Sequence, residues 1–145
     1  MYSNETNVKP RILHIELSFQ LTGMCFKAHN HLGQFCRERQ YGDALAIELS
    51  GAGISFKRER PVEVAGRKSS FVDFVIEDKI AVELKAKSFI EKEDYYQIQR
   101  YLRSAKLELG VLVNFAQPHL KPKRVLNPDM QNNSEHSDGY ILLEN

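Results

Sequence analysis

The sequence has few cysteines and no long apolar run, and each absence excludes a class of protein. Its two cysteines, Cys25 and Cys36, have no second pair, so they indicate neither a disulfide framework nor a zinc site. No apolar stretch is long enough to span a membrane, and the polar start over residues 1–10 is not a signal peptide. We therefore expect a protein of the reducing cytoplasm with no membrane partner.

The sequence also has little net charge. Its 20 Lys and Arg residues and 19 Asp and Glu residues leave a formal net charge of +1, so no global field attracts a polyanion. Any contact with nucleic acid must then depend on local basic patches.

Length and composition predict one domain with a modest core. The chain has 145 residues and is 42% hydrophobic. We expect the domain over residues 11–126, after a flexible N-terminus (1–10). Residues 127–145 are rich in Asn, Ser, Asp and Gly, which predicts a disordered tail.

Residues 70–87 predict the β-hairpin around which the other elements are organised. Apolar and polar residues alternate in two runs that are joined by the acidic turn 77–79. With this turn Ile76 pairs with Ile80, and Asp73 lies opposite Glu83. Directly opposed residues have Cβ atoms about 4.5–5.5 Å apart. Two carboxylates at that distance repel each other unless a proton or a cation lies between them.

The two carboxylates form a candidate metal site for Mg²⁺ or Mn²⁺. Mg²⁺ takes oxygen ligands from one or two carboxylates and leaves its other positions to water and phosphate. Lys85 returns to the face of Glu83 and places a positive charge beside the site. The metal would polarise a phosphoryl oxygen and acidify a water, while Lys85 would orient that water or offset charge in the transition state. This arrangement suits hydrolysis of a phosphodiester.

A structural explanation of the same residues stays open. Charged residues that alternate with valines are typical of an amphipathic strand with a solvated face, and Lys85 alone could neutralise the two carboxylates. The basic residues Lys57, Arg58 and Arg60 have two explanations as well, because they fit either a solvated strand face or a rim that guides phosphate.

The other predicted elements complete a mixed sheet with helices. Helical spacing of apolar residues and end signals predict three helices, over 13–32, 35–50 and 91–105. Strands are predicted over 54–64, where Pro61 indicates an edge position or a bulge, and over 109–115, with a short edge strand ending near Leu126. The strand over 109–115 follows a helix, so we expect it to run parallel to the preceding strand through a right-handed crossover. The predicted class is α+β (α/β), with a mixed central sheet flanked by helices and the order α-α-β-β-β-α-β.

Asp73 followed by Glu83-Leu84-Lys85 resembles the signature of the PD-(D/E)XK nuclease superfamily, although Val72 stands where that signature has a proline. Over residues 17–125 the chain is similar to the GxxExxY family of that superfamily. Phe35, however, occupies the position of the glycine in that family's name. The further matching pieces are 27–33, Glu38 with Tyr41, 44–45, 97–102, 110–115 and 123–125.

The resemblance implies a restriction-endonuclease-like PD-(D/E)XK core and a metal-dependent nuclease that acts on nucleic acid, with DNA as the expected substrate. It also implies that Glu38, on the helix before the sheet, belongs to the active site. Tyr41 is expected to pack in the core, and it stays open whether its hydroxyl reaches the site. Gln97 and Tyr101 resemble the Gln-x-x-x-Tyr motif of RecB-type nucleases. That motif implies that Gln97 braces the metal-site residues and that Tyr101 contacts a backbone phosphate.

A second hypothesis is a noncatalytic module that keeps the fold and binds nucleic acid or a protein. A domain of this size offers little surface for gripping a duplex, so a homodimer or a complex with a protein partner is one expected arrangement.

Overall fold

The computed structural model describes residues 14–64, 66–130 and 140–142. The predicted order α-α-β-β-β-α-β is confirmed, and it is followed by two further strands. The elements are α1 (Ile15–Leu32), α2 (Glu38–Gly51), β1 (Phe56–Val64), β2 (Arg67–Ile76), β3 (Ile80–Lys85), α3 (Lys92–Ala105), β4 (Leu109–Asn114), β5 (Lys123–Leu126), the short 3-10 helix η2 (Pro128–Met130) and β6 (Tyr140–Leu142).

The strands form one mixed six-stranded sheet in the order β1-β2-β3-β4-β5-β6. β3 and β4 run parallel, and the other neighbouring pairs are antiparallel. Parallel neighbours need a long crossover, and α3 supplies it. The predicted α+β class, with a mixed sheet and a parallel pair reached through a helix, is therefore confirmed.

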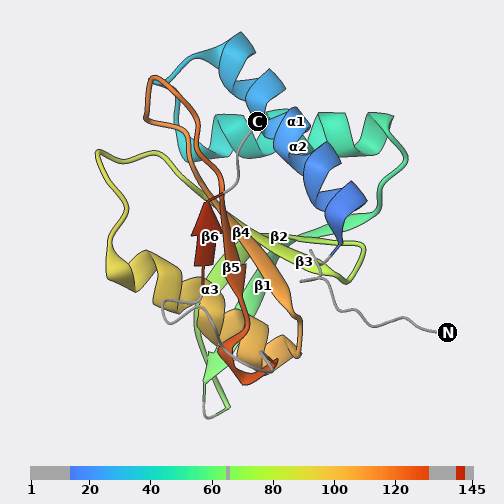
Figure 1. Ribbon diagram of the computed structural model, residues 1–145, viewed down its shortest axis with the longest axis vertical. Coiled ribbons are helices and arrows are strands. Elements are labelled where there is room, and N and C mark those ends of the chain that lie inside the picture. The colour runs from blue at the N-terminus through green and yellow to red at the C-terminus, as the bar shows by residue number, and fades with distance from the viewer. Residues whose placement is uncertain (1–13, 65, 131–139, 143–145) are drawn as a thin grey trace, which may run out of the picture.

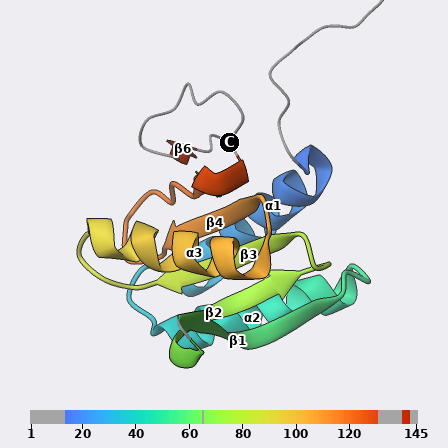
Figure 2. The same ribbon diagram turned by 90° about the horizontal axis from the view of Figure 1, so that it is seen from below.

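Helices cover both faces of the sheet (Figures 1 and 2). On one face α1 and α2 contribute residues such as Leu45 to a cluster with Phe74 and Val82. On the other face Ile98 of α3 packs in a cluster with Ala81. Successive strand residues point to opposite faces, so the apolar runs of β3 and β4 serve both clusters. A charged side chain near the middle of this sheet is therefore an exception that needs partners.

The β2–β3 hairpin has the predicted register. Ile76 pairs with Ile80, and the turn is closed by the backbone N–H of Lys79, which donates to the carbonyl of Ile76 at 2.9 Å. Glu77 and Asp78 adopt left-handed conformations with φ of 51° and 53°. The turn allows the two strands to pair directly, which fixes which residues lie opposite each other.

Pro61 lies on an edge strand, as predicted, because β1 is the first strand of the sheet. The β1–β2 ladder also has a register shift between Val62 and Glu63. Proline cannot donate a ladder hydrogen bond, so an edge position is where a strand tolerates it.

The prediction of a disordered tail over 127–145 is wrong for the part that the structure describes. η2 follows β5 directly, and the side chain of Asn127 donates to the carbonyls of Leu102 and Leu107 at 3.0 and 2.9 Å. β6 then pairs antiparallel with β5, so β5 is not the predicted edge strand. The backbone groups on the open side of β5 favour such pairing, although the polar composition around it predicts disorder. The other tail residues and the predicted flexible N-terminus (1–10) lie outside the described residues.

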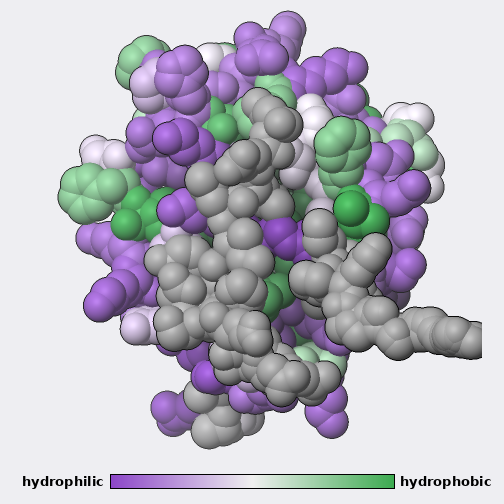
Figure 3. Space-filling model, viewed as in Figure 1, coloured by the Kyte–Doolittle hydropathy of each residue, from purple (hydrophilic) through white to green (hydrophobic). Residues whose placement is uncertain are grey.

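The face in Figure 3 is mostly hydrophilic, and its apolar side chains form separate spots. No helix within residues 14–64, 66–130 and 140–142 is long and apolar enough to cross a membrane.

Candidate functional site

The strands β2 and β3 separate just beyond Phe74 and Val82, the last pair of their ladder. In place of a further ladder pair, the backbone N–H of Asp73 donates to Glu83 Oε1 at 3.2 Å. The backbone N–H of Leu84 donates to Asp73 Oδ2 at 2.6 Å. The predicted pair of carboxylates is thus brought together, but each one caps the opposite strand. We call Asp73 and residues 83–85 the fork.

Lys85 lies beside Glu83 in the fork, as the alternation of β3 predicts. Its Nζ is 3.2 Å from Glu83 Oε2 and 3.7 Å from Asp94 Oδ1. The pKa of Lys85 is raised: burial favours its neutral form, but the ion pair with Glu83 and the negative charges of Asp94 and Glu38 outweigh that effect. Lys85 therefore stays charged at neutral pH and is a donor and a positive charge, not a free base.

The two carboxylates of the fork are poorly solvated. Burial raises the pKa of Glu83 from 4.5 to about 8, and the charge of Asp73 adds to the rise, while Lys85 opposes it. Burial also raises the pKa of Asp73 above its ordinary value, and the charge of Glu38 contributes. Because both charged forms are disfavoured, the fork has an electrostatic need for a proton or a further cation.

Gln97 reaches the fork from α3. Its Nε2 donates to Glu83 Oε2 at 3.3 Å and to the carbonyl of Phe71 at 3.1 Å. These contacts join α3, β2 and β3 at one point, so the amide restrains the Glu83 carboxylate.

Glu38 reaches the fork from the opposite face of the sheet. It is the first residue of α2, and its Oε2 accepts a hydrogen bond of 3.3 Å from the backbone N–H of Ala86. Its charge acts on both Asp73 and Lys85. The structure thus brings together Glu38, Asp73, Glu83, Lys85 and Gln97.

The two tyrosines singled out from the sequence have other surroundings. Tyr41 is fully buried and stacks on Phe115 with ring centroids 4.2 Å apart. Its hydroxyl donates to the carbonyl of Gly33 and accepts from the backbone N–H of Cys36. Tyr41 therefore holds the α1–α2 loop. Tyr101 packs against two of the core clusters, and no hydrogen bond or ion pair joins it to the described residues of the fork.

The sequence analysis missed Asp94, which is buried although it lies in the first turn of α3. Asp94 pairs with Lys87 at 2.9 Å and with Lys85 at 3.7 Å. Burial works against its charge, but the backbone N–H of Glu91 and the two lysines outweigh burial and lower its pKa. Asn114 holds the same loop by accepting from the N–H of Lys87 at 3.2 Å and donating to its carbonyl at 2.9 Å. The sequence showed Asp94 only as an acid at a helix start, because the fold of the 86–91 loop has no simple pattern.

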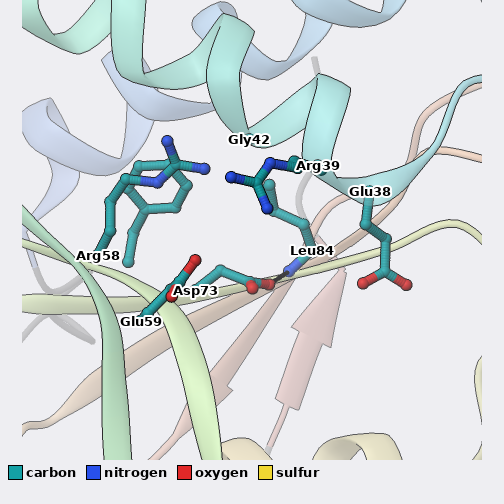
Figure 4. Close-up of a pocket in the computed structure, with 8 residues that line it drawn as sticks. Glu38, Arg39, Gly42, Arg58, Glu59, Asp73 and Leu84 are labelled. Atoms are coloured by element: carbon teal, nitrogen blue, oxygen red, sulfur yellow. Dashed lines mark hydrogen bonds between the residues drawn. The ribbon is translucent and has the colours of Figure 1, made fainter.

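A pocket of about 300 Å³ opens beside the fork, between α2 and the strands (Figure 4). It combines acidic and basic side chains with a small apolar wall. The residues that line it are Glu38, Arg39, Gly42, Arg58, Glu59, Asp73, Phe74 and Leu84. The predicted basic rim therefore contributes Arg58 to the pocket. Arg39 was missed because the resemblance singles out Glu38 and Tyr41 but not the arginine between them.

Two carboxylates are the donors that the fork offers to a metal. The described ranges contain no group of three or more His, Cys, Asp or Glu residues that could hold a metal ion. Mg²⁺ can be held by one or two carboxylates with water in its other positions, so the donor set still fits this ion. Asp73 accepts the backbone N–H of Leu84 through Oδ2, and the raised pKa values of Asp73 and Glu83 give the fork a need for positive charge.

Comparison with known proteins gives a match to a family model. No match was found among the curated proteins or among the solved structures. The model described as the PD-(D/E)XK nuclease superfamily matches residues 15–125, which include all of the fork and its partners from α2 and α3. The chain belongs to the PD-(D/E)XK nuclease superfamily.

Proposed function

We propose that this protein is a Mg²⁺- or Mn²⁺-dependent nuclease that hydrolyses phosphodiester bonds, with DNA as the expected substrate. The observation that carries the proposal is the meeting of a buried carboxylate (Glu83) and a half-buried one (Asp73) with a charged lysine in the fork. The carboxylates of Asp73 and Glu83 would hold the metal. When bound, the metal supplies a Lewis acid that polarises a phosphoryl oxygen and acidifies a water.

The side chains around the carboxylates have distinct roles in this proposal. Lys85 donates to the attacking water or to the oxygen on which charge develops, and its ion pair with Glu83 keeps it charged. Gln97 orients Glu83 through its 3.3 Å hydrogen bond. Glu38 adds a negative charge at the mouth of the fork, where it accepts the N–H of Ala86. The contact of Tyr101 with a backbone phosphate stays a prediction.

The finer assignments are part of the same proposal. Membership of the GxxExxY family is supported by Glu38, which touches the strand end of the fork, and by Tyr41, which holds the α1–α2 loop. A cytoplasmic location agrees with the two free cysteines. A homodimer or a protein partner would enlarge the surface available to a duplex.

One observation favours the noncatalytic alternative. Lys85 already pairs with Glu83 at 3.2 Å, which offsets one carboxylate charge without any metal. In a module that only binds nucleic acid or a protein, this ion pair would be a structural feature.

The test is cleavage of labelled single- and double-stranded DNA and RNA by the purified protein in Mg²⁺ or Mn²⁺. We expect cutting that EDTA stops and that Asp73→Asn lowers by at least about 100-fold, because the variant loses a charged metal ligand. Asp78→Asn is the matched control, since Asp78 is exposed in the hairpin turn and asparagine tolerates its left-handed backbone. Absence of cutting on all four substrates, with folded protein, would favour the binding module.

A further inference from the structure

We infer that Arg39 and Arg58 form a binding site for a backbone phosphate of the nucleic acid, on the α2 side of Asp73. We call these two residues the phosphate clamp. The inference rests on the proposed function, and it adds the contact that would position the strand beside the fork.

The two guanidinium groups meet in the pocket. Figure 4 shows Arg39 extending from α2 and Arg58 from β1 toward each other, with Gly42 above them and Asp73 below. Each group comes from a different element, so the fold and not the local sequence brings them together. A pair of guanidinium groups on one side of a pocket suits an anion that accepts several hydrogen bonds.

The acidic residues of the pocket do not neutralise these arginines. Arg58 forms its ion pair with Asp43, which does not line the pocket, at 3.0 Å. Among the described residues, neither Arg39 nor Arg58 forms an ion pair with Glu38, Glu59 or Asp73. Arg39 has no ion pair in the described part of the chain, and Arg58 is offset only by Asp43 from outside the pocket, so both guanidinium groups can contact a ligand.

Arg58 is held in place with donor capacity left over. Its guanidinium carbon lies 5.0 Å from the centroid of the Phe74 ring, and Asp43 accepts from its Nη1. A guanidinium has five N–H donors. Nη1 donates to Asp43, and Nε is buried without a hydrogen-bond partner in the described part of the chain, so the donors of Nη2 are left for an anion. A stacked arginine that is fixed on one side loses little freedom when it binds an anion on the other.

Gly42 makes room for this arrangement. A Cβ at position 42 would lie 2.8 Å from Nη2 of Arg58, so any larger residue would displace the guanidinium. Gly42 does not have the left-handed φ that would explain a glycine by itself. The absence of a side chain at this point of α2 therefore matters for where Arg58 lies.

A phosphodiester is the anion that fits this position. The pocket of about 300 Å³ is at the small end of ligand pockets, which span roughly 300–1,000 Å³. It can therefore take part of one strand. Asp73 and Glu59 repel an anion from the strand side, so its phosphate is expected against the two arginines. A nucleic-acid strand bound there would lie next to the fork, because Asp73 belongs to both the pocket and the fork.

The test measures binding without cutting. Fluorescence anisotropy of a labelled single-stranded DNA oligonucleotide is recorded in EDTA over a series of salt concentrations. Arg58→Gln and Arg39→Gln should each weaken binding about tenfold, the order of one charge-assisted contact. Each should also lower the slope of log affinity against log salt by about 0.7. Arg103→Gln is the charge-matched control, because Arg103 is an exposed arginine on α3 that pairs with Asp129. It should leave both the affinity and the salt slope close to those of the wild type.

Gly42→Ala tests the geometry without changing any charge. It should weaken binding severalfold by displacing Arg58, while the better helix propensity of alanine keeps the protein at least as stable. This variant and Arg39→Gln still test the clamp if Arg58→Gln does not fold.

The outcomes separate the clamp from the nuclease. If the wild type binds and the clamp variants bind as tightly as Arg103→Gln, the clamp is wrong even if the protein cuts. Failure of the wild type to bind any oligonucleotide also overturns it. If the clamp variants lose binding while the wild type cuts no substrate, the phosphate-binding site is confirmed and the proposed nuclease activity is contradicted.

Discussion

Glu83 is a buried carboxylate between Val82 and Leu84 on β3, and its surroundings explain its raised pKa. Gln97, Lys85 and the N–H of Asp73 all contact its two oxygens. These contacts only partly offset the loss of water and the charge of Asp73, so its pKa is raised to about 8. Without metal, the charged form of this group is therefore disfavoured in the folded protein.

The raised pKa predicts how stability depends on pH in metal-free protein. Folding binds a proton to Glu83 between its ordinary pKa of 4.5 and about 8, so its stabilising contribution is complete below pH 4.5 and is lost as the pH rises to 8. The raised pKa of Asp73 acts in the same direction. We expect the melting temperature in EDTA to fall from pH 5 to pH 8, by an amount equivalent to a few kcal/mol at about 1.4 kcal/mol per pKa unit.

Glu83→Gln should remove most of this fall, because the amide has no proton to lose. Thermal unfolding at pH 5, 6.5 and 8 measures it, and the variant should be more stable than the wild type at pH 8. Glu63→Gln, at an exposed position on β1, is the control and should keep the wild-type slope. A wild-type melting temperature that rises from pH 5 to pH 8 would contradict this account of Glu83.

At the scale of elements, the position of α3 over the sheet decides whether Gln97 and Asp94 reach the fork. α3 approaches β4 closely where Gly110 faces Ile98. A Cβ at position 110 would lie 2.7 Å from Cδ1 and 3.0 Å from Cγ1 of Ile98. Ile98 is fully buried and cannot move into solvent. The absence of a side chain at Gly110 therefore allows α3 to lie this close to β4.

Gly110→Ala should destabilise the protein by about 1–3 kcal/mol, the usual cost of overpacking a core. Adding Ile98→Val, which removes Cδ1, should recover part of that loss. Gly51→Ala is the matched control, because a Cβ there meets no atom within 4 Å, and it should be neutral or slightly stabilising. Chemical denaturation of the four proteins measures the free energies of unfolding. If Gly110→Ala and the wild type have equal free energies of unfolding, α3 can move away from β4 without loss of stability, which would contradict this account.

Much at this scale could be predicted from the sequence. The alternation in 70–87 and its acidic turn gave the hairpin register of Ile76 with Ile80, and that register in turn brought Asp73 to Glu83. These features are local, since neighbouring residues determine them. β6 could not be predicted, because its pairing depends on the open edge of β5 and not on its own polar surroundings. The contacts of Asp94 depend on how the 86–91 loop folds, which no periodic pattern encodes.

At the scale of the whole molecule, charge is local and not global. The formal net charge of +1 gives no general attraction for a polyanion, yet Arg39 and Arg58 lie together in one pocket. The pocket and the fork lie among α2 and the strands β1, β2 and β3, away from the β5–β6 side of the sheet. The sequence placed Arg58 on a basic strand, but only the packing of α2 against the sheet brings it to Arg39. Long-range packing of this kind is the part of the site that sequence patterns do not contain.

The claim that the fork is a catalytic centre depends on Lys85 more than on any other residue, because its charge would act on the substrate in a nuclease but would only pair with Glu83 in a binding module. The most direct test is the single-turnover rate of DNA cleavage in Mg²⁺ by Lys85→Ala, beside Lys79→Ala from the exposed hairpin turn. We predict a loss of about 100-fold or more for Lys85→Ala and no change for Lys79→Ala. Binding of the uncut oligonucleotide should be retained. A Lys85→Ala protein that is folded and cuts at the wild-type rate would contradict the proposed function.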